Sequence, residues 1–288
     1  MSLACIHTHS LFCDGKDDVE TFCRVAYEKG MDSLGFSAHA PIFEKTGFRT
    51  NWHLKNERLG EYLDSVRSAK KRWEGKLPVY LGMEVDFIQG VTGPADKYYQ
   101  DMELDYIIAS VHYVVPPKGE PFTVDGPSEE VEQGIKEGFG GDPMGMVESY
   151  FNSEETMIRA GGFDVLGHPD LVKLHNTENK FFNPQSEFYL KRIAALAALL
   201  AETGVPSELN TGGINRNKIS ECYPSLDFLK CFRKRNIPIV INADAHSAKD
   251  LDGNYEKARK AMLDAGYTQT VLFGGRINGK VAWKSEKL

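Results

Sequence analysis

Two short motifs place potential metal ligands on one face of a strand. They are His7-x-His9 near the amino terminus and Asp244-x-His246, which follows a run of apolar residues late in the chain. Side chains two residues apart in a strand point to the same side, so each motif could bind one metal ion with both side chains. Taken alone, each motif also fits an ordinary strand end, where polar side chains and turn-forming aspartates are common.

Three further histidines stand at the end of an apolar run. They are His39, His112 and His168, and with the two motifs they bring six of the eight histidines to predicted strand ends. His53 and His175 are the exceptions. One such histidine alone is more often a local polar residue, but six placed alike predict one shared site.

Three carboxylates are candidates as well. Glu84 lies inside an apolar strand-like run, where burying its charge without a partner would be costly. A metal ion or an arginine would offset that cost. Asp86 points the same way and is a weaker rival, and Asp14, which precedes a glycine, also suits a plain turn.

Nine residues therefore form the candidate ligand set: His7, His9, Asp14, His39, Glu84, His112, His168, Asp244 and His246. Imidazole and carboxylate donors without thiolates suit zinc, manganese or iron in the divalent state. One ion takes about three or four protein ligands. The set therefore predicts two or three divalent transition metals.

Seven short apolar runs separate the helix patterns, and each is typical of a parallel strand buried on both faces. The runs cover residues 3–9, 33–39, 78–86, 106–113, 163–170, 205–211 and 238–246. Helix patterns cover residues 17–29, 56–74, 143–160, 186–203, 226–235 and 249–265. This alternation predicts an α/β protein. The run 270–273 is either an eighth strand or an edge strand.

The chemistry-bearing residues follow almost every strand, which favours a closed (β/α) barrel with its site at the carboxyl ends of the strands. An open doubly wound sheet would instead bind its ligand at one switch point. The glycine-rich fingerprints of dinucleotide-binding and P-loop proteins are both absent. We expect one domain over residues 1–288, with residues 116–141 interrupting the pattern as an inserted loop or lid.

Composition narrows the class of protein. Of the 288 residues, 41% are hydrophobic and 26% charged, as in ordinary globular proteins, and no apolar run nears the ~18 residues of a membrane span. The 34 basic and 41 acidic residues give a net charge of −7, which disfavours long nucleic acid and anionic membranes as partners. Five cysteines without a C-x-x-C pair argue against a disulfide framework and indicate a cytoplasmic protein.

An ordered set of motifs runs through nearly the whole chain: His7-x-His9, His39, Glu84, His112, His168-Pro-Asp and Asp244-x-His246. This set resembles the polymerase-and-histidinol-phosphatase (PHP) superfamily. Segments 82–86, 110–112 and 208–211 are similar to its monofunctional histidinol-phosphate phosphatases. The resemblance implies a distorted seven-stranded (β/α) barrel, of the TIM type, with a trinuclear metal centre.

The same resemblance implies which residues share an ion: His7, His9, Glu84 and Asp244 for the first; Glu84, as a bridge, with His112 and His168 for the second; and Asp14, His39 and His246 for the third. Many members of the superfamily have histidine where this chain has Asp14. That difference bears on the occupancy and metal preference of the third position.

The implied reaction is the hydrolysis of L-histidinol phosphate to L-histidinol and phosphate in histidine biosynthesis, by a metal-bound hydroxide and without a covalent nucleophile. Two arginines are candidates for binding the small-molecule phosphomonoester, since a guanidinium matches phosphate oxygens. Arg159 ends a helix pattern, and Arg216 follows the run 205–211. Either could also be a surface residue, and the resemblance favours Arg159.

Three alternatives remain open from the residues. One is another PHP-type phosphoesterase, acting on nucleotides or other small phosphate esters. A second is an amidohydrolase-like C–N hydrolase, although such barrels often use a bridging lysine and no lysine ends a predicted strand here. The third is a metal-stabilised binding module without catalysis, which the full ligand set disfavours.

Overall fold

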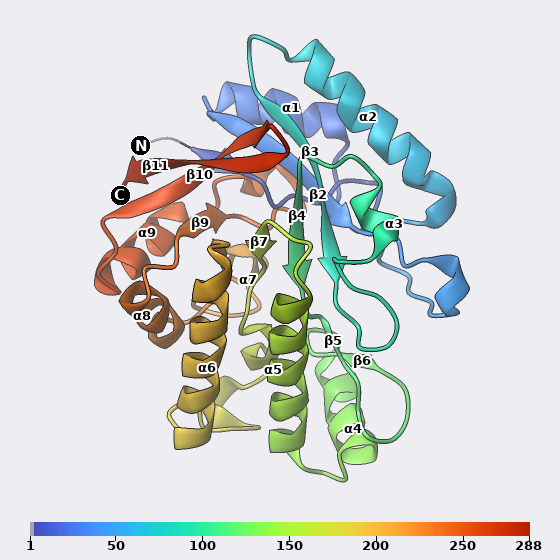
Figure 1. Cartoon of the computed structure of the whole chain (residues 1–288), viewed down its shortest axis with the longest axis vertical. Coiled ribbons are helices and arrows are strands. Elements are labelled where there is room, and N and C mark those ends of the chain that lie inside the picture. Colours follow the sequence, from blue (N-terminus) through green and yellow to red (C-terminus); the bar gives the residue numbers. More distant parts are fainter. Residues whose placement is uncertain (1–2) are drawn as a thin grey trace.

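The computed structural model describes residues 3–288, and its centre is a seven-stranded parallel sheet (Figure 1). Neighbouring strands follow the order β1-β2-β3-β4-β7-β8-β9. Their bounds are Ala4–Cys5 (β1), Ser33–His39 (β2), Val79–Asp86 (β3), Tyr106–Ser110 (β4), Val165–Leu166 (β7), Ser207–Asn210 (β8) and Ile239–Asn242 (β9). The predicted α/β class is confirmed.

The first and last strands of this sheet meet and close it into a barrel. Thr8 and Ala245 form a parallel bridge just beyond β1 and β9. The amide of His9 donates to the carbonyl of Ala245 at 2.9 Å, and the amide of Ala245 donates to the carbonyl of His7 at 3.1 Å. A distorted seven-stranded (β/α) barrel results, as expected.

Helices connect the strands and cover the outside of the barrel. They are α1 (Val19–Glu28), α2 (Leu59–Arg72), α3 (Lys97–Gln100), α4 (Ser128–Gly138), α5 (Pro143–Ala160), α6 (Glu187–Thr203), α7 (Gly212–Asn215), α8 (Leu226–Lys234) and α9 (Tyr255–Asp264). Short 3-10 helices lie at Glu44–Thr46, Asn56–Arg58, Leu171–Lys173, Thr177–Asn179 and Ala248–Asp250. All six predicted helices are present, but the last begins at Tyr255 because residues 248–250 form a separate turn.

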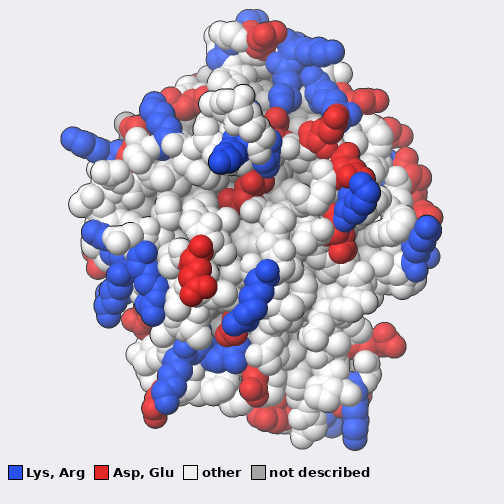
Figure 2. Space-filling view, viewed as in Figure 1, with Lys and Arg blue, Asp and Glu red and all other residues white. Residues whose placement is uncertain are grey.

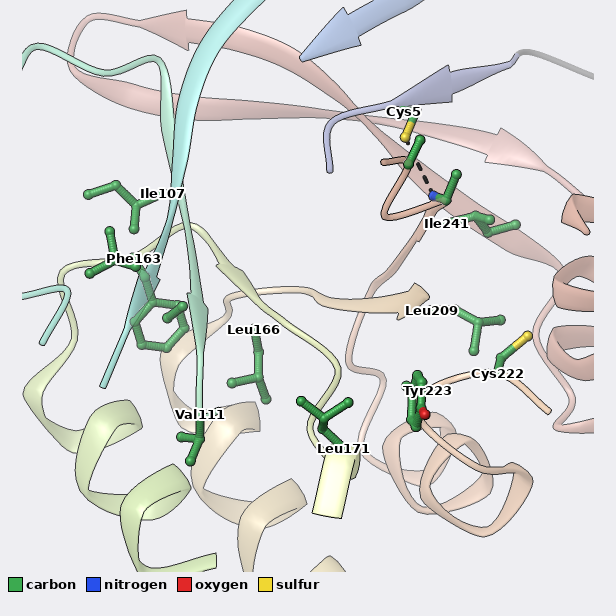
Figure 3. Close-up of a cluster of buried hydrophobic side chains, with 14 of the residues drawn as sticks. Cys5, Ile107, Val111, Phe163, Leu166, Leu171, Leu209, Cys222, Tyr223 and Ile241 are labelled. Carbon is green, nitrogen blue, oxygen red and sulfur yellow. Dashed lines mark hydrogen bonds between the residues drawn. The ribbon is translucent and has the colours of Figure 1, made fainter. Parts of the chain in front are cut away.

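Side chains of one strand alternate between the barrel interior and the layer under the helices. In β4, Tyr106 and Ile108 belong to the interior cluster, whereas Ile107 belongs to the outer one. Figure 3 shows Ile107 in the outer layer together with Leu166 and Leu209 from the next strands. Both faces are apolar, which is why the strand runs read as nearly continuous hydrophobic segments.

The amino end of the barrel is closed by a separate antiparallel hairpin, β10 (Gln269–Ile277) with β11 (Lys280–Lys287) (Figure 1). Phe273 from this hairpin is buried against Tyr106 inside the barrel, with ring centroids 5.0 Å apart. The run 270–273 is therefore not an eighth barrel strand. These residues pair with β11 in a sheet of their own, and the bridge between Thr8 and Ala245 already joins the two ends of the barrel sheet.

Tyr106 also explains two glycines of the barrel wall. Its hydroxyl donates to the carbonyl of Phe36 at 3.0 Å. A Cβ on Gly35 would lie 2.4 Å from the Tyr106 hydroxyl, and one on Gly82 would lie 2.4 Å from its ring. Only glycine lets the ring cross the interior at this level.

An inserted segment, residues 116–141, lies at the opposite end, where the strands finish (Figure 1). It contains β6 (Phe122–Thr123), which pairs with β5 (Tyr113–Val114), and the helix α4. The segment is thus partly helical rather than a plain loop. Within residues 3–288, no helix is both long and apolar enough to cross a membrane.

Candidate metal centre

All nine candidate ligands converge at the carboxyl end of the barrel. His39 is the last residue of β2, and Glu84 lies near the end of β3. Asp14 lies in the loop between β1 and α1, and the other ligands follow their strands by a few residues. Parallel strands bring their carboxyl ends to one rim. The run 33–39 coincides with β2, and the run 78–86 ends with β3. The other five predicted runs extend past the carboxyl ends of their strands, because their final residues leave the ladder near this rim.

Glu84 lies at the centre of the cluster and is 1% exposed. Its Oε2 atom is 3.2 Å from Nε2 of His7, 3.5 Å from Nε2 of His9 and 2.9 Å from Nδ1 of His39. Three imidazoles from β1 and β2 therefore face one carboxylate oxygen.

The other oxygen of Glu84 faces the next two strands. Oε1 lies 2.9 Å from Nε2 of His168 and 3.7 Å from Nε2 of His112, and it accepts a hydrogen bond from Ser110 at 2.6 Å. Glu84 thus lies between two groups of histidines, which is the arrangement of a carboxylate that bridges two ions.

Two aspartates complete the cluster. Oδ1 of Asp244 is 3.2 Å from Nε2 of His9. Asp14 is more open, with a side chain 34% exposed, and its oxygens lie 3.6 Å from Nε2 of His39 and 3.1 Å from Nε2 of His246. Asp14 thus lies beside the two histidines with which the resemblance groups it.

The buried polar atoms of the cluster are better suited to binding metal ions than to hydrogen bonding with one another. Nε2 of His7, Nε2 of His9 and Nδ1 of His39 lie 2.9–3.5 Å from Oε2 of Glu84. None of these four buried atoms has the geometry of a hydrogen bond to any described residue. Buried polar atoms are rarely left without a partner. Imidazole and carboxylate donors this close together suit divalent transition metals.

Four sets of ligand atoms lie within 4.8 Å of one another: His9, Asp14, His39 and His246; His7, Glu84 and His168; His7, His9 and Asp244; and His39, Asp86 and His112. These sets overlap the three implied groups but add His9 to the most exposed one. They also bring Asp86 beside His112.

The charges of the cluster shift the pKa values of its members in opposite directions. Burial alone would raise the pKa of Glu84, but the charges of the surrounding histidines outweigh burial and hold this pKa well below its ordinary value. Burial lowers the pKa of His112, but the charges of Asp86 and Glu84 raise it to about 10. Burial and the charge of His39 lower the pKa of His9 to about 3. Metal ions would displace the protons that the raised histidines hold.

Glu208 was not among the predicted site residues. Glu208 is fully buried in β8, its Oε2 accepts from Nδ1 of His7 at 2.9 Å, and its Oε1 accepts from the amide of His168 at 3.0 Å. A carboxylate behind a ligand histidine fixes the ring and its tautomer. An acidic residue inside an apolar strand was the available signal, as it was for Glu84.

Asp86 supports a candidate ligand histidine in the same way. It accepts from Nδ1 of His112 at 2.8 Å and from Nε2 of His53 at 2.7 Å. His53, which the sequence analysis left outside the cluster, is therefore the outer partner of Asp86. Asp86 contacts one candidate ligand, whereas Glu84 contacts five.

The expectation for Arg159 is wrong, because the residue lies at the other end of the barrel. A helix that follows a barrel strand runs antiparallel to it, so the last turn of α5 returns to the amino ends. The following loop pairs there, with the amide of Asp164 donating to the carbonyl of Ile107. The Arg159 side chain is 60% exposed, 3.4 Å from Glu155.

Arg216 lies in the site. It follows α7, and its guanidinium donates to Oδ2 of Asp244 at 2.9 Å and lies 2.8 Å from Nδ1 of His246. Both arginine and cluster line a cavity of about 230 Å³, which the inserted segment borders through Thr123 and Asp125.

Comparisons with known proteins agree with this geometry. The model of the PHP domain family matches residues 6–212. The "Probable histidinol-phosphatase" of Deinococcus radiodurans is 29% identical over 273 residues, 94% of this chain and 96% of that protein. The "Histidinol-phosphatase" of Bacillus subtilis is 26% identical over 266 residues, 87% of this chain and 96% of that protein.

A solved structure supports the fold. The histidinol phosphate phosphatase of Lactococcus lactis, complexed with zinc, L-histidinol and phosphate, superposes with a TM-score of 0.67 at 19% identity, covering 98% of this chain and 99% of that one. The family match includes seven of the nine candidate ligands and extends through β8. This chain belongs to the PHP domain family.

Proposed function

We propose that this protein is a metal-dependent phosphatase that hydrolyses L-histidinol phosphate to L-histidinol and phosphate. The observation that supports this reaction type is the position of Glu84. Its buried carboxylate lies between two sets of histidines, beside a cavity that an arginine also lines. The names of the Deinococcus and Bacillus relatives supply the substrate.

The proposed ligands are the nine residues at the carboxyl rim, which would hold two or three divalent ions of zinc, manganese or iron. Bound metals supply a water of lowered pKa and positive charge for the entering and leaving oxygens. Glu208 and Asp86 hold the ligand histidines in place through their Nδ1 atoms.

Arg216 is the proposed phosphate contact from the protein. Its guanidinium is tied to Asp244, a candidate ligand, so a phosphate oxygen on the metals would lie beside it. A planar guanidinium matches the oxygens of a phosphate dianion and offsets their charge.

The thiol beside the cluster is a poor candidate for a covalent nucleophile that would compete with water. The nearest thiol, Cys13, lies 3.6 Å from Nδ1 of His9. Burial, with the charge of Asp14, raises the pKa of this thiol to about 12. A thiol with that pKa stays protonated and is a poor nucleophile.

The cavity suits a small ester. At about 230 Å³ it is below the ~300–1,000 Å³ of drug-sized ligand sites. On the face shown in Figure 2, basic and acidic side chains are interspersed rather than gathered into a basic stripe. All five cysteines are free, which supports a reducing, cytoplasmic setting for the reaction.

Phosphate release by one purified, metal-loaded sample tests the proposal. L-histidinol phosphate, nucleoside monophosphates and p-nitrophenyl phosphate are compared by kcat/KM, with and without prior chelation. We expect the highest value for L-histidinol phosphate and loss of activity after chelation. A preference for nucleotides would indicate another phosphoesterase, and absence of phosphate release from every ester would overturn the phosphatase function.

A further inference from the structure

The cavity above the metal cluster carries charges of both signs outside the candidate ligands. Arg216 and Lys218 provide positive charge on the wall that follows β8. Asp125 provides negative charge to the same cavity from the inserted segment. A site that only had to hold phosphate would gain nothing from this carboxylate, because it repels a phosphate dianion.

Asp125 has no cation of its own. Within residues 3–288 its side chain makes no hydrogen bond or ion pair, and Arg216, the nearest guanidinium of the cavity wall, donates to Asp244 instead. Asp125 nevertheless lines the same cavity as Glu84 and His112 of the cluster. The carboxylate is thus close to the reaction centre and free to bind a ligand.

The backbone on both sides of Asp125 is anchored. Before it, Val124 is 1% exposed, and its amide donates to the carbonyl of His112 at 2.8 Å. After it, the carbonyl of Gly126 accepts from Nε2 of His175 at 2.7 Å. An acidic side chain held between two fixed residues is preorganised for binding.

We propose that Asp125 binds the protonated amino group of the alcohol part of the substrate, and so makes this site select phosphate esters of amino alcohols. The inference rests on the proposed phosphatase function and adds the residue that sets its specificity. In L-histidinol phosphate the amine is on the carbon next to the phosphate-bearing one, so it is the cationic group closest to the phosphate. In a cavity of about 230 Å³ that Arg216 and Asp125 both line, an ester whose phosphate contacts Arg216 can bring this amine to Asp125.

The test compares two substrates that differ only in the amine. They are L-histidinol phosphate and 3-(imidazol-4-yl)propyl phosphate, which keeps the imidazole and the phosphate. A hydrogen bond to a charged group is worth about 10- to 150-fold in kcat/KM, or ~1.4–3 kcal/mol. The wild-type protein should prefer the amino ester by a factor in this range.

In Asp125→Asn we expect kcat/KM for L-histidinol phosphate to fall by about 10- to 150-fold, mainly through KM, with little change for the ester without the amine. Inhibition by L-histidinol should weaken in parallel. Glu129→Gln is the matched control, because it removes an exposed carboxylate of the same segment outside the cavity lining. Asp125→Glu, which keeps the charge, should retain part of the preference.

Failure of the inference and failure of the function give different results. If the wild-type protein hydrolyses both esters equally well, or if Asp125→Asn loses activity equally on both, the amine-binding role is overturned and the phosphatase function stands. If a metal-loaded wild-type sample hydrolyses neither ester, the proposed function itself is overturned, and the inference with it.

Discussion

Replacement of Arg216 separates the two arginines that the sequence offered for phosphate. In Arg216→Ala the cavity loses a guanidinium that lies beside Asp244 and His246, 2.9 and 2.8 Å away. Arg159→Ala removes an equally charged side chain from the far end of the barrel, where it is 60% exposed and pairs with Glu155. The second variant is therefore a matched control for loss of one positive charge.

The expected effects follow from these contacts. A charge-assisted hydrogen bond to phosphate is worth about 1.5–3 kcal/mol, which corresponds to roughly 10- to 150-fold in kcat/KM. Arg216→Lys should recover only part of this loss, because an ammonium cannot form a planar fork. Arg159→Ala should leave the kinetics unchanged, and its exposed pair and helix-end position are worth at most ~1 kcal/mol of stability.

Steady-state kinetics, inhibition by inorganic phosphate and metal content per chain are measured on all three variants. Weaker phosphate inhibition in Arg216→Ala at unchanged metal content would establish direct contact with phosphate. A parallel loss of metal would instead mean that Arg216 acts by positioning Asp244, its ion-pair partner. Unchanged kcat/KM in Arg216→Ala, or an equal loss in Arg159→Ala, would refute the assignment.

Three further predictions concern the metals and the buried acids. Elemental analysis should find more than one transition-metal equivalent per chain, and chelation should abolish phosphatase activity; at most one equivalent with full activity after EDTA would contradict the multinuclear centre. Glu84→Gln should lower metal content and activity more than Asp86→Asn, because Glu84 faces both sets of histidines while Asp86 orients His112. For Asp86→Asn we expect a loss of about 10- to 100-fold in metal affinity or activity. Equal losses in the two variants would exclude Glu84 as the bridge. Glu154 is fully buried in α5, and burial raises its pKa well above the ordinary value, so the folded state holds a proton that the unfolded state releases above pH ~4.5. The wild-type protein should therefore lose stability relative to Glu154→Gln by about 1.4 kcal/mol per pH unit as the pH rises from that value toward the folded pKa, and a melting-temperature difference that does not change between pH 5 and pH 7 would refute a protonated Glu154.

Local pattern was enough to predict the elements of this barrel and the chemistry of its rim. The helix α5 occupies its predicted bounds, 143–160, because amphipathic spacing and a following glycine are local signals. The two strands β1 and β7 are each two residues long, far shorter than their apolar runs. Strand length depends on where a neighbouring strand stops pairing, and that is a property of the assembled sheet.

The sequence by itself determined which residue types reach the rim, since a histidine or acid at the end of an apolar run is visible without a fold. It could not determine the supporting contacts. Glu208 meets His7 across 201 positions of the chain. Asp86 joins His53, from the loop after β2, to His112, which follows β4. Only the tertiary structure decided between the two arginines. A strand and the helix after it run in opposite directions, so a residue that is near a strand in the sequence can lie at either end of the barrel.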